Sequence, residues 1–229
     1  MVIALSTVIQ EDHCGADDAL KTPFAKGETV TYSIKKLKLT VGTATLTFHG
    51  LVSLNGREAV EILLTAKGFR FFDEEKIYLD PVTLYPIVIR RDLDIFGVKE
   101  KIDEFYDLER GKVRIVKTAK GVTSEQTLTG SERFDNIYGF IYRYRRSGQL
   151  VAGEEFTLHL PMRDVKFKLV EHKKIRVANR DFDAYYMDSV PKKYKVWFDS
   201  GPQMIPLMID GAIGFGHTSM VMTAYAPGR

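Results

Sequence analysis

The sequence predicts a mainly β protein, built as one strongly curved antiparallel sheet (a half-barrel or open barrel) with one principal α-helix near 136–146. Three observations support this fold class. From Pro23 onward, apolar and polar residues alternate with a period of two, which is typical of strands that bury one face. Turn residues interrupt the alternation at short intervals, which favours antiparallel neighbours. Only one segment has the three-and-four spacing of an amphipathic helix.

The first strand pattern places Val30, Tyr32 and Ile34 on one face. The apolar parity then changes across Lys35 and Lys36. One inserted residue in a strand has this effect, so we predict a bulge or a sharp bend at these two lysines.

Three hairpins follow from turn residues and alternation. Asn55-Gly56 is a strong signal for a two-residue turn, and Gly111 closes a second short loop. We also predict a hairpin within 165–177, where one face of the first strand carries Val165, Phe167 and Leu169.

The helical segment lies between Asp135, the expected N-cap, and Gly148, just beyond the expected end. Its apolar face consists of Phe134, Ile137, Tyr138, Ile141 and Tyr144. The last turn carries Arg143, Arg145 and Arg146. Cations at this end favour the helix dipole, so a solvated basic end explains them, and a phosphate-binding cluster is the alternative.

Two stretches share one cadence: IYLDPVTLYPIVIRR at 77–91 and VWFDSGPQMIPLMID at 196–210. In each, an Asp ends a strand and a Pro opens the returning strand. The aspartate can accept hydrogen bonds from backbone amides of the turn, and proline suits the start of a strand. We therefore expect two hairpins of similar build, arising from either duplication or chance.

Length and composition favour one globular domain. The chain has 229 residues, of which 45% are hydrophobic and 28% charged. We expect a single β-rich domain at 23–226, preceded at 1–22 by a flexible arm or the remnant of an export signal. MVIALSTVIQ is too short to span a bilayer and lacks the basic residues that precede a secretory core.

Charge and motifs argue against several functional classes. The 33 basic and 30 acidic residues are spread along the chain, and no nucleic-acid motif occurs, so we expect no nucleic-acid partner and no transmembrane segment. The histidines lack the spacing of metal ligands, so we expect neither a metal nor a cofactor. No catalytic constellation stands out. Asp92 and Asp94 share a strand face, and His217 lies among glycines.

The only tryptophan, Trp197, shares a strand face with Lys193 and Lys195. Lysine stems can cover an indole ring at a sheet edge. Alternatively, this face is an aromatic and cationic contact for an anionic amphiphile or a partner protein.

Several segments together resemble a family of exported bacterial envelope proteins classed as a domain of unknown function. These are PFAKGETVTYSIKKLKLTVGTATL, YLDPVTLYP, FYDLERGKV, DNIYGFIYRYR, AGEEFTLHL, DAYYMDSV and KVWFDSGPQMIPLMI. The resemblance implies a β-rich fold, kinship with the half-barrels of lipoprotein carriers, and a periplasmic or envelope location. The concave face of those half-barrels holds acyl chains.

We therefore expect a non-enzymatic envelope protein that binds a lipid or a lipoprotein acyl chain in a curved-sheet groove. The expected binding residues are Trp197, Lys193, Lys195, Tyr138 and Ile141. The alternative is an assembly module that binds another envelope protein through a sheet edge or the Trp197 face. A third hypothesis is a hydrolase that uses His217 or the pair Asp92 and Asp94.

Overall fold

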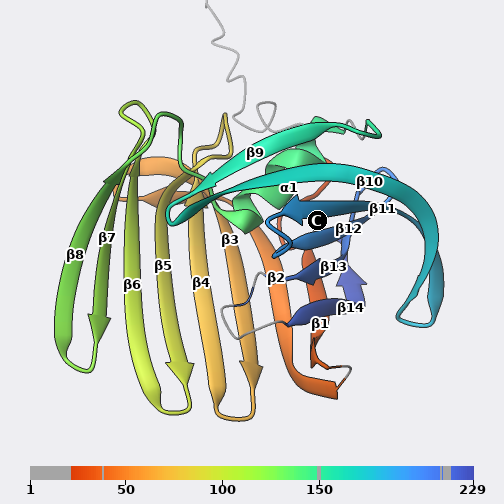
Figure 1. The fold of residues 1–229 in the computed structure, drawn as a ribbon, viewed down its shortest axis with the longest axis horizontal. Helices are drawn as coiled ribbons and strands as arrows, with labels where there is room; N and C mark the ends of the chain where they lie inside the picture. The colour runs from red at the N-terminus through yellow and green to blue at the C-terminus, as the bar shows by residue number, and fades with distance from the viewer. Residues whose placement is uncertain (1–21, 38, 149–150, 212, 214–217) are drawn as a thin grey trace, which may run out of the picture.

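The computed structural model describes residues 22–37, 39–148, 151–211, 213 and 218–229. Within them, one sheet of 14 strands curls around a single α-helix (Figure 1). The expected N-terminal arm lies almost wholly outside the described residues.

The strands of the first half are β1 (Thr29–Lys36), β2 (Leu39–Leu54), β3 (Arg57–Gly68), β4 (Phe71–Leu79), β5 (Pro86–Ile95), β6 (Val98–Asp107), β7 (Lys112–Ala119) and β8 (Val122–Thr129). The helix α1 (Ile137–Ser147) follows. The strands of the second half are β9 (Glu155–Leu160), β10 (Arg163–Val177), β11 (Arg180–Val190), β12 (Lys195–Asp199), β13 (Pro206–Asp210) and β14 (Ser219–Ala226).

Nearly every strand pairs with its neighbours in the chain. The order across the sheet is β8-β7-β6-β5-β4-β3-β2-β1-β14-β13-β12-β11-β10-β9. The first and last strands, β1 and β14, pair antiparallel in the middle of the sheet. The described sheet is therefore open, with β8 and β9 as its edges, which confirms the prediction of an open, mainly β architecture.

Bulges bend the longest strands around the helix. The register of β2 against β3 shifts between Phe48 and Gly50, and that of β10 against β11 shifts between Leu169 and Glu171. An extra residue on one strand increases the local bend and twist. These two strands have 16 and 15 residues, so each can follow the curve from one end of the barrel to the other.

The concave face of the sheet packs on the helix. One hydrophobic cluster joins inward side chains of both halves of the sheet to α1 residues such as Tyr138, Phe140 and Ile141. The concave face of the sheet therefore has an apolar lining. The helix α1 lies inside the curve of the sheet (Figure 1), and its side chains cover part of the concave face.

The N-cap of the helix is Asn136, which corrects the prediction of Asp135. The Asn136 side chain accepts hydrogen bonds from the backbone amides of Tyr138 and Gly139, at 2.8 and 3.2 Å. Asp135 instead pairs with Arg143 of the helix. At the other end, Gly148 has φ of 64°, in the left-handed region, which confirms the predicted helix end.

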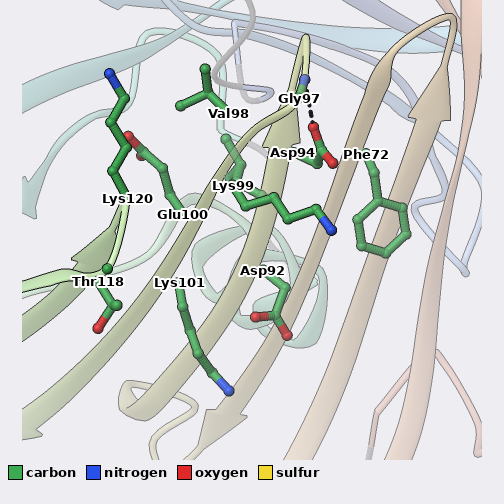
Figure 2. Close-up of a pocket in the computed structure, with 12 residues that line it drawn as sticks. Phe72, Asp92, Asp94, Gly97, Val98, Lys99, Glu100, Lys101, Thr118 and Lys120 are labelled. Atoms are coloured by element: carbon green, nitrogen blue, oxygen red, sulfur yellow. Dashed lines mark hydrogen bonds between the residues drawn. The ribbon is translucent and has the colours of Figure 1, made fainter.

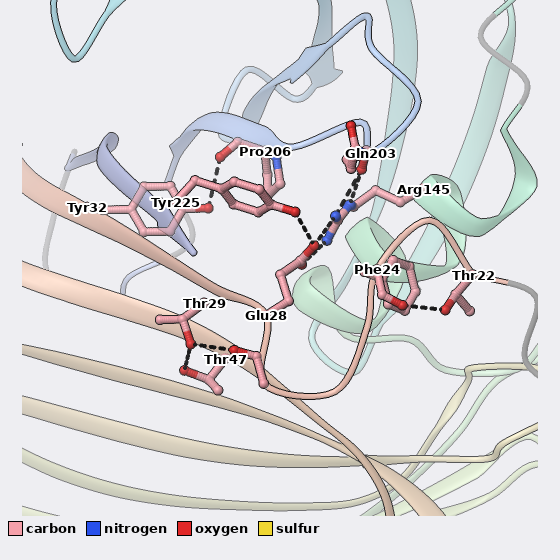
Figure 3. A network of polar contacts seen from close by, with 11 residues as sticks. Thr22, Phe24, Glu28, Thr29, Tyr32, Thr47, Arg145, Gln203, Pro206 and Tyr225 are labelled. Atoms are coloured by element: carbon pink, nitrogen blue, oxygen red, sulfur yellow. Dashed lines mark hydrogen bonds and ion pairs between the residues drawn. The ribbon is translucent and has the colours of Figure 1, made fainter. Parts of the chain in front are cut away.

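The basic end of the helix is not simply solvated. Arg145 is fully buried, and its Nη1 and Nη2 atoms donate to Glu28 at 2.7 and 2.8 Å (Figure 3). Arg145 also donates to the Gln203 carbonyl, and Tyr225 donates to Glu28 at 3.0 Å. This network fixes α1 to the start of β1, the β12–β13 loop and β14.

Most predicted turns are present. The bend at Lys35 and Lys36 is confirmed, because a register shift falls between Ile34 and Lys35 and the chain reverses into β2. The hairpins at Asn55-Gly56 and Gly111 are confirmed as well. The predicted hairpin within 165–177 is wrong. That segment is one continuous strand, β10, in which a bulge between Leu169 and Glu171 shifts the register without reversing the chain.

The repeated cadence corresponds to two loops of the same build. Asp80 accepts from the backbone amides of Val82 and Thr83, and its own amide donates to the carbonyl of Tyr85. In the β12–β13 loop, the amide of Asp199 likewise donates to the carbonyl of Ile205. Proline begins the next strand in each case, as predicted.

Candidate functional site

An apolar hollow opens at the end of the barrel where the β1–β2, β3–β4 and β5–β6 hairpins turn. Its volume is about 440 Å³. It is lined by Ile34, Lys36, Thr40, Val41, Phe69, Phe71, Phe96 and Ile213. We call this site the apolar hollow. Its size and its mainly hydrophobic and aromatic lining are typical of small-ligand pockets.

Two hairpin tips supply aromatic rings to the hollow. The side chain of Phe69 is 85% exposed and that of Phe96 is 52% exposed. The amide of Phe96 donates to the Arg70 carbonyl at 2.8 Å, which holds the β3–β4 and β5–β6 turns side by side. Exposed apolar side chains that are grouped in this way indicate an interaction site.

A second, polar cavity lies deeper on the same concave face, beneath the start of the helix. Its volume is about 200 Å³. The lining consists of Glu75, Ile89, Arg91, Ile102, Glu104, Tyr106, Asp135, Asn136, Ile137, Tyr138, Leu160, Pro161 and Tyr194. We call it the polar cavity. Phe71 of the apolar hollow and Glu75 of the polar cavity belong to one inward-facing row of β4, about 13 Å apart at 3.3 Å per residue.

An ion pair borders the polar cavity. Arg91 donates through Nε and Nη2 to the two carboxylate oxygens of Asp73, at 2.8 and 2.6 Å. The same Nε lies 3.8 Å from an oxygen of Glu75. Asn136 donates to the other Glu75 oxygen at 2.8 Å, so the helix cap and β4 are joined. The two hydrogen bonds to Asp73 hold the Arg91 guanidinium group in one orientation.

Burial changes the protonation of the acidic groups in the polar cavity. Desolvation raises the pKa of Glu75 to about 7, although Arg91 acts in the opposite direction. Desolvation also raises the pKa of Glu104, whose carboxylate accepts from the Tyr106 hydroxyl. These carboxyl groups therefore ionise at a higher pH than exposed ones.

A third hollow, about 700 Å³ in volume, lies over β4, β5, β6 and β7 (Figure 2). Asp92 and Asp94 do share its wall, as the sequence predicts. In the sheet register, Asp92 stands opposite Lys101 and Asp94 opposite Lys99. Asp94 also accepts from the Gly97 amide at 2.9 Å. Acidic residues of β5 thus stand opposite basic residues of β6, so the wall shows a ladder of opposite surface charges rather than an isolated acid pair.

Trp197 lies on the face of β12 opposite to the buried Val196 and Phe198. Its ring stacks on Tyr186, with 4.3 Å between centroids. The ammonium group of Lys173 lies 4.9 Å from the Trp197 centroid. A lysine therefore covers the indole, as one of our two interpretations holds, but this lysine comes from β10.

Of the other predicted binding residues, only Lys195 lies in the cluster around Trp197. Lys195 lies 5.9 Å from the ring centroid of Tyr186, within the same outer cluster. Lys193 is in the turn before β12 and lies over the ring of Tyr194 instead. Tyr138 and Ile141 are buried in the core beneath the sheet. Whether any of the five binds a ligand stays a prediction.

Sequence reasoning missed the acidic and basic residues of the polar cavity. Asp73 and Glu75 stand at the inward parity of β4, between Phe71 and Ile77. Arg91 occupies the corresponding parity of β5. Charged residues at core positions of an alternating strand were the available signal, because such charges are seldom buried without partners. His217 lies outside the described residues.

Within the part of the chain that the structure describes, no group of three or more His, Cys, Asp or Glu side chains could hold a metal ion. No helix in that part is both long and apolar enough to cross a membrane.

A family described as "Protein of unknown function (DUF3108)" matches residues 29–223, which is most of the chain. The chain belongs to the DUF3108 family. No curated protein matches it in sequence.

Structural comparison supports the fold of this DUF3108 protein. A solved structure from Brucella abortus, described as a β-barrel-like protein of domain of unknown function DUF1849, is similar with a TM-score of 0.53. The similarity covers 89% of this chain and 98% of that chain, at 11% sequence identity. At this identity the likeness concerns the fold alone, which is barrel-like in both.

Proposed function

We propose that this DUF3108 protein is a non-enzymatic carrier or sensor that binds the alkyl chain of an anionic amphiphile in the apolar hollow. The observation that carries the proposal is the group of aromatic and aliphatic side chains around an open volume of about 440 Å³. Burying a chain there would remove apolar surface from water on both partners, at about 25 cal/mol per Å².

The charge around the apolar hollow favours an anionic headgroup. Lys36 is part of the lining, and Lys67 and Arg70 are exposed on either side of Phe69. Asp73, the next acidic residue along β4, is buried and paired with Arg91. The rim contributed by β1 and the β3–β4 hairpin is therefore basic, and a carboxylate or phosphate beside it would gain from this charge.

The proposed location is the periplasm or another part of the bacterial envelope. The resemblance to exported envelope proteins supports it, and an apolar site for amphiphiles suits a compartment next to membranes. Fractionation of native host cells, with antibodies to this protein, tests the location. Recovery of the protein in the cytosol alone would contradict it.

Titration calorimetry with laurate, below its micellar concentration, tests the binding itself. We expect saturable binding to the wild-type protein. Val41→Glu places a carboxylate in the hollow at a position that is already 36% exposed. We expect it to weaken laurate binding about tenfold or more, which corresponds to about 1.4 kcal/mol.

Val122→Glu is the matched control, because Val122 is 70% exposed and lies at the start of β8, outside the lining. It should bind laurate like the wild type. Absence of laurate binding, or equal affinity in the two variants, would overturn the proposal. Organic extraction of the purified protein should also release a bound amphiphile, which mass spectrometry of the extract would detect.

A second candidate function is strand addition by a partner protein. In the described sheet, β8 pairs only with β7 and β9 pairs only with β10. Each of these two edge strands therefore has a row of backbone groups that no neighbouring strand pairs. Extended peptides can add to such edges. Proline substitutions along the free side of β8 that abolish capture of a cross-linked envelope partner would support this candidate.

A further inference from the structure

The hydroxyl group of Tyr138 is buried in the structure without a hydrogen-bond partner among the described residues. The side chain is only 1% exposed, and it lines the polar cavity. A buried hydroxyl without a partner costs about 1–3 kcal/mol. A polar cavity of about 200 Å³ beside such a group indicates a ligand that completes the missing bond.

The charged groups around the polar cavity decide which kind of ligand fits. They are the carboxyl groups of Asp73, Glu75, Glu104 and Asp135 and the guanidinium groups of Arg91 and Arg143. Each arginine holds one aspartate in a two-point pair. The nearest cation to Glu75 is Arg91 at 3.8 Å, and its hydrogen-bond donor is the neutral Asn136 amide. Glu104 accepts from the neutral Tyr106. When both glutamates are ionised, the cavity therefore has an excess of negative charge.

An anion is a poor fit for the same cavity. The start of a helix usually offers free amides to an anion. Here the Asn136 side chain already accepts from the amides of Tyr138 and Gly139, and the Asn136 amide donates to Asp135. The donors of Arg91 that face Asp73 are occupied too.

The walls of the cavity suit a small organic cation. The rings of Tyr106, Tyr138 and Tyr194 line it, and aromatic faces attract ammonium groups. A volume of about 200 Å³ equals that of several water molecules at about 30 Å³ each, so a group of a few heavy atoms fits.

We infer that the polar cavity binds a protonated primary amine, with Glu75 and Glu104 as counter-ions and the Tyr138 hydroxyl oxygen as a hydrogen-bond acceptor. The ligand class is a small alkylammonium group. This inference is independent of amphiphile binding in the apolar hollow, because the two sites share no lining residue.

Thermal unfolding at pH 8 with n-propylammonium chloride as the probe tests the inference. We expect the unfolding midpoint to rise and to saturate with probe concentration, because a ligand of the folded state stabilises it. Potassium chloride at equal ionic strength and neutral 1-propanol should not reproduce this saturable rise. At pH 5.5, where Glu75 is protonated, the apparent affinity should fall about tenfold or more.

Tyr138→Phe and its matched control Tyr144→Phe separate ligand binding from stability. Both residues lie on α1, and both hydroxyls are buried without a partner among the described residues, but Tyr144 does not line the polar cavity. Both variants should fold at least as stably as the wild type. Only Tyr138→Phe should lose affinity for n-propylammonium, about fivefold or more.

Glu75→Gln removes one counter-ion and should weaken probe binding about tenfold or more. A midpoint that responds equally to the probe and to potassium chloride would overturn the inference. So would unchanged probe affinity in both Tyr138→Phe and Glu75→Gln. Laurate binding should be the same in Tyr138→Phe as in the wild type, so failure of one proposal is distinguishable from failure of the other.

Discussion

Glu28 and Arg145, which are 117 positions apart in the chain, form a two-point ion pair with both side chains fully buried (Figure 3). The guanidinium group also lies 4.8 Å from the ring centroid of Phe24 and 5.0 Å from that of Tyr142. The pair connects the end of the helix to the entry of β1, next to the β1–β14 seam where the two halves of the sheet meet.

Removal of one partner of this pair should destabilise the fold strongly. Arg145→Met keeps most of the side-chain volume but leaves the buried Glu28 carboxylate without its guanidinium partner. We expect a loss of about 3–5 kcal/mol in the free energy of unfolding. Urea denaturation followed by circular dichroism measures it.

The double variant Glu28→Leu/Arg145→Met is the control for this interpretation. It removes both charges, so no buried carboxylate is left unpaired, and it should recover much of the lost stability. A single variant that loses less than about 1 kcal/mol, or a double variant no more stable than Arg145→Met, would show that the pair does not act as a buried unit.

The acidic groups of the polar cavity should make stability depend on pH. Glu75 has a pKa of about 7 in the folded protein, against 4.5 without the fold. Between these values the folded state holds a proton that the unfolded state has lost, so stability falls as pH rises from about 4.5 to 7. The difference corresponds to roughly 3 kcal/mol at 1.36 kcal/mol per pH unit.

Glu75→Gln should abolish most of this decline, because glutamine keeps the shape but does not ionise. Asp73, Arg91 and Glu104 face Glu75 from β4, β5 and β6, and Asn136 faces it from the N-cap of the helix. Burial raises the pKa of Glu104 as well, so a smaller decline of the same sign should remain. Unfolding free energies measured in urea at pH 5 and pH 8 check this. An unchanged slope in Glu75→Gln would contradict the assignment.

The strands and the helix could be predicted because their signals are local. Alternation in β1 and the Asn55-Gly56 turn each depend on a few neighbouring residues. The pairing of β1 with β14 depends on contacts between the two ends of the chain, which no local pattern specifies. In β10, a run of exposed residues interrupts the alternation after Leu169, where a bulge lies, and the sequence alone does not distinguish such a bulge from a turn.

The polar cavity could not be predicted for a related reason. Alternation marks Asp73, Glu75 and Arg91 as inward-facing, but their partners come from separate strands and from the start of α1. Only the register of β4 against β5 sets Asp73 and Arg91 within reach of each other. A charged residue at an apolar position predicts an unusual site without identifying its partners.

A third prediction concerns the close approach of β2 and β3 near the apolar hollow. Gly42 of β2 stands opposite Gly68 of β3. A Cβ atom on Gly42 would lie 2.5 Å from the carbonyl oxygen of Lys67, so Gly42→Ala forces the backbones apart. We expect a loss of about 1–3 kcal/mol in the free energy of unfolding, measured in urea. Thr43→Ala, at the exposed neighbouring position, should change it by no more than about 0.5 kcal/mol. Equal effects of the two changes would contradict the close contact.

A fourth prediction concerns Trp197 and distinguishes laurate binding on the concave face of the sheet from binding on the outer face. Trp197 is on the outer face of β12, whereas the apolar hollow opens on the concave side between Ile34 and Phe71. Trp197→Ala should therefore leave the affinity for laurate unchanged in calorimetry. It removes the stack on Tyr186 and the Lys173 contact, so it should reduce the free energy of unfolding by about 1 kcal/mol or more.

Fluorescence gives an independent check, because Trp197 is the only tryptophan in the chain. Laurate bound in the apolar hollow would not contact the Trp197 indole. The emission maximum of Trp197 should therefore stay at a constant wavelength through the laurate titration. A shift in the emission maximum, together with a tenfold loss of laurate affinity in Trp197→Ala, would place the ligand on the outer face. In that case the anionic amphiphile would contact the cluster of Trp197, Tyr186, Lys173 and Lys195, and Val41→Glu would bind laurate normally.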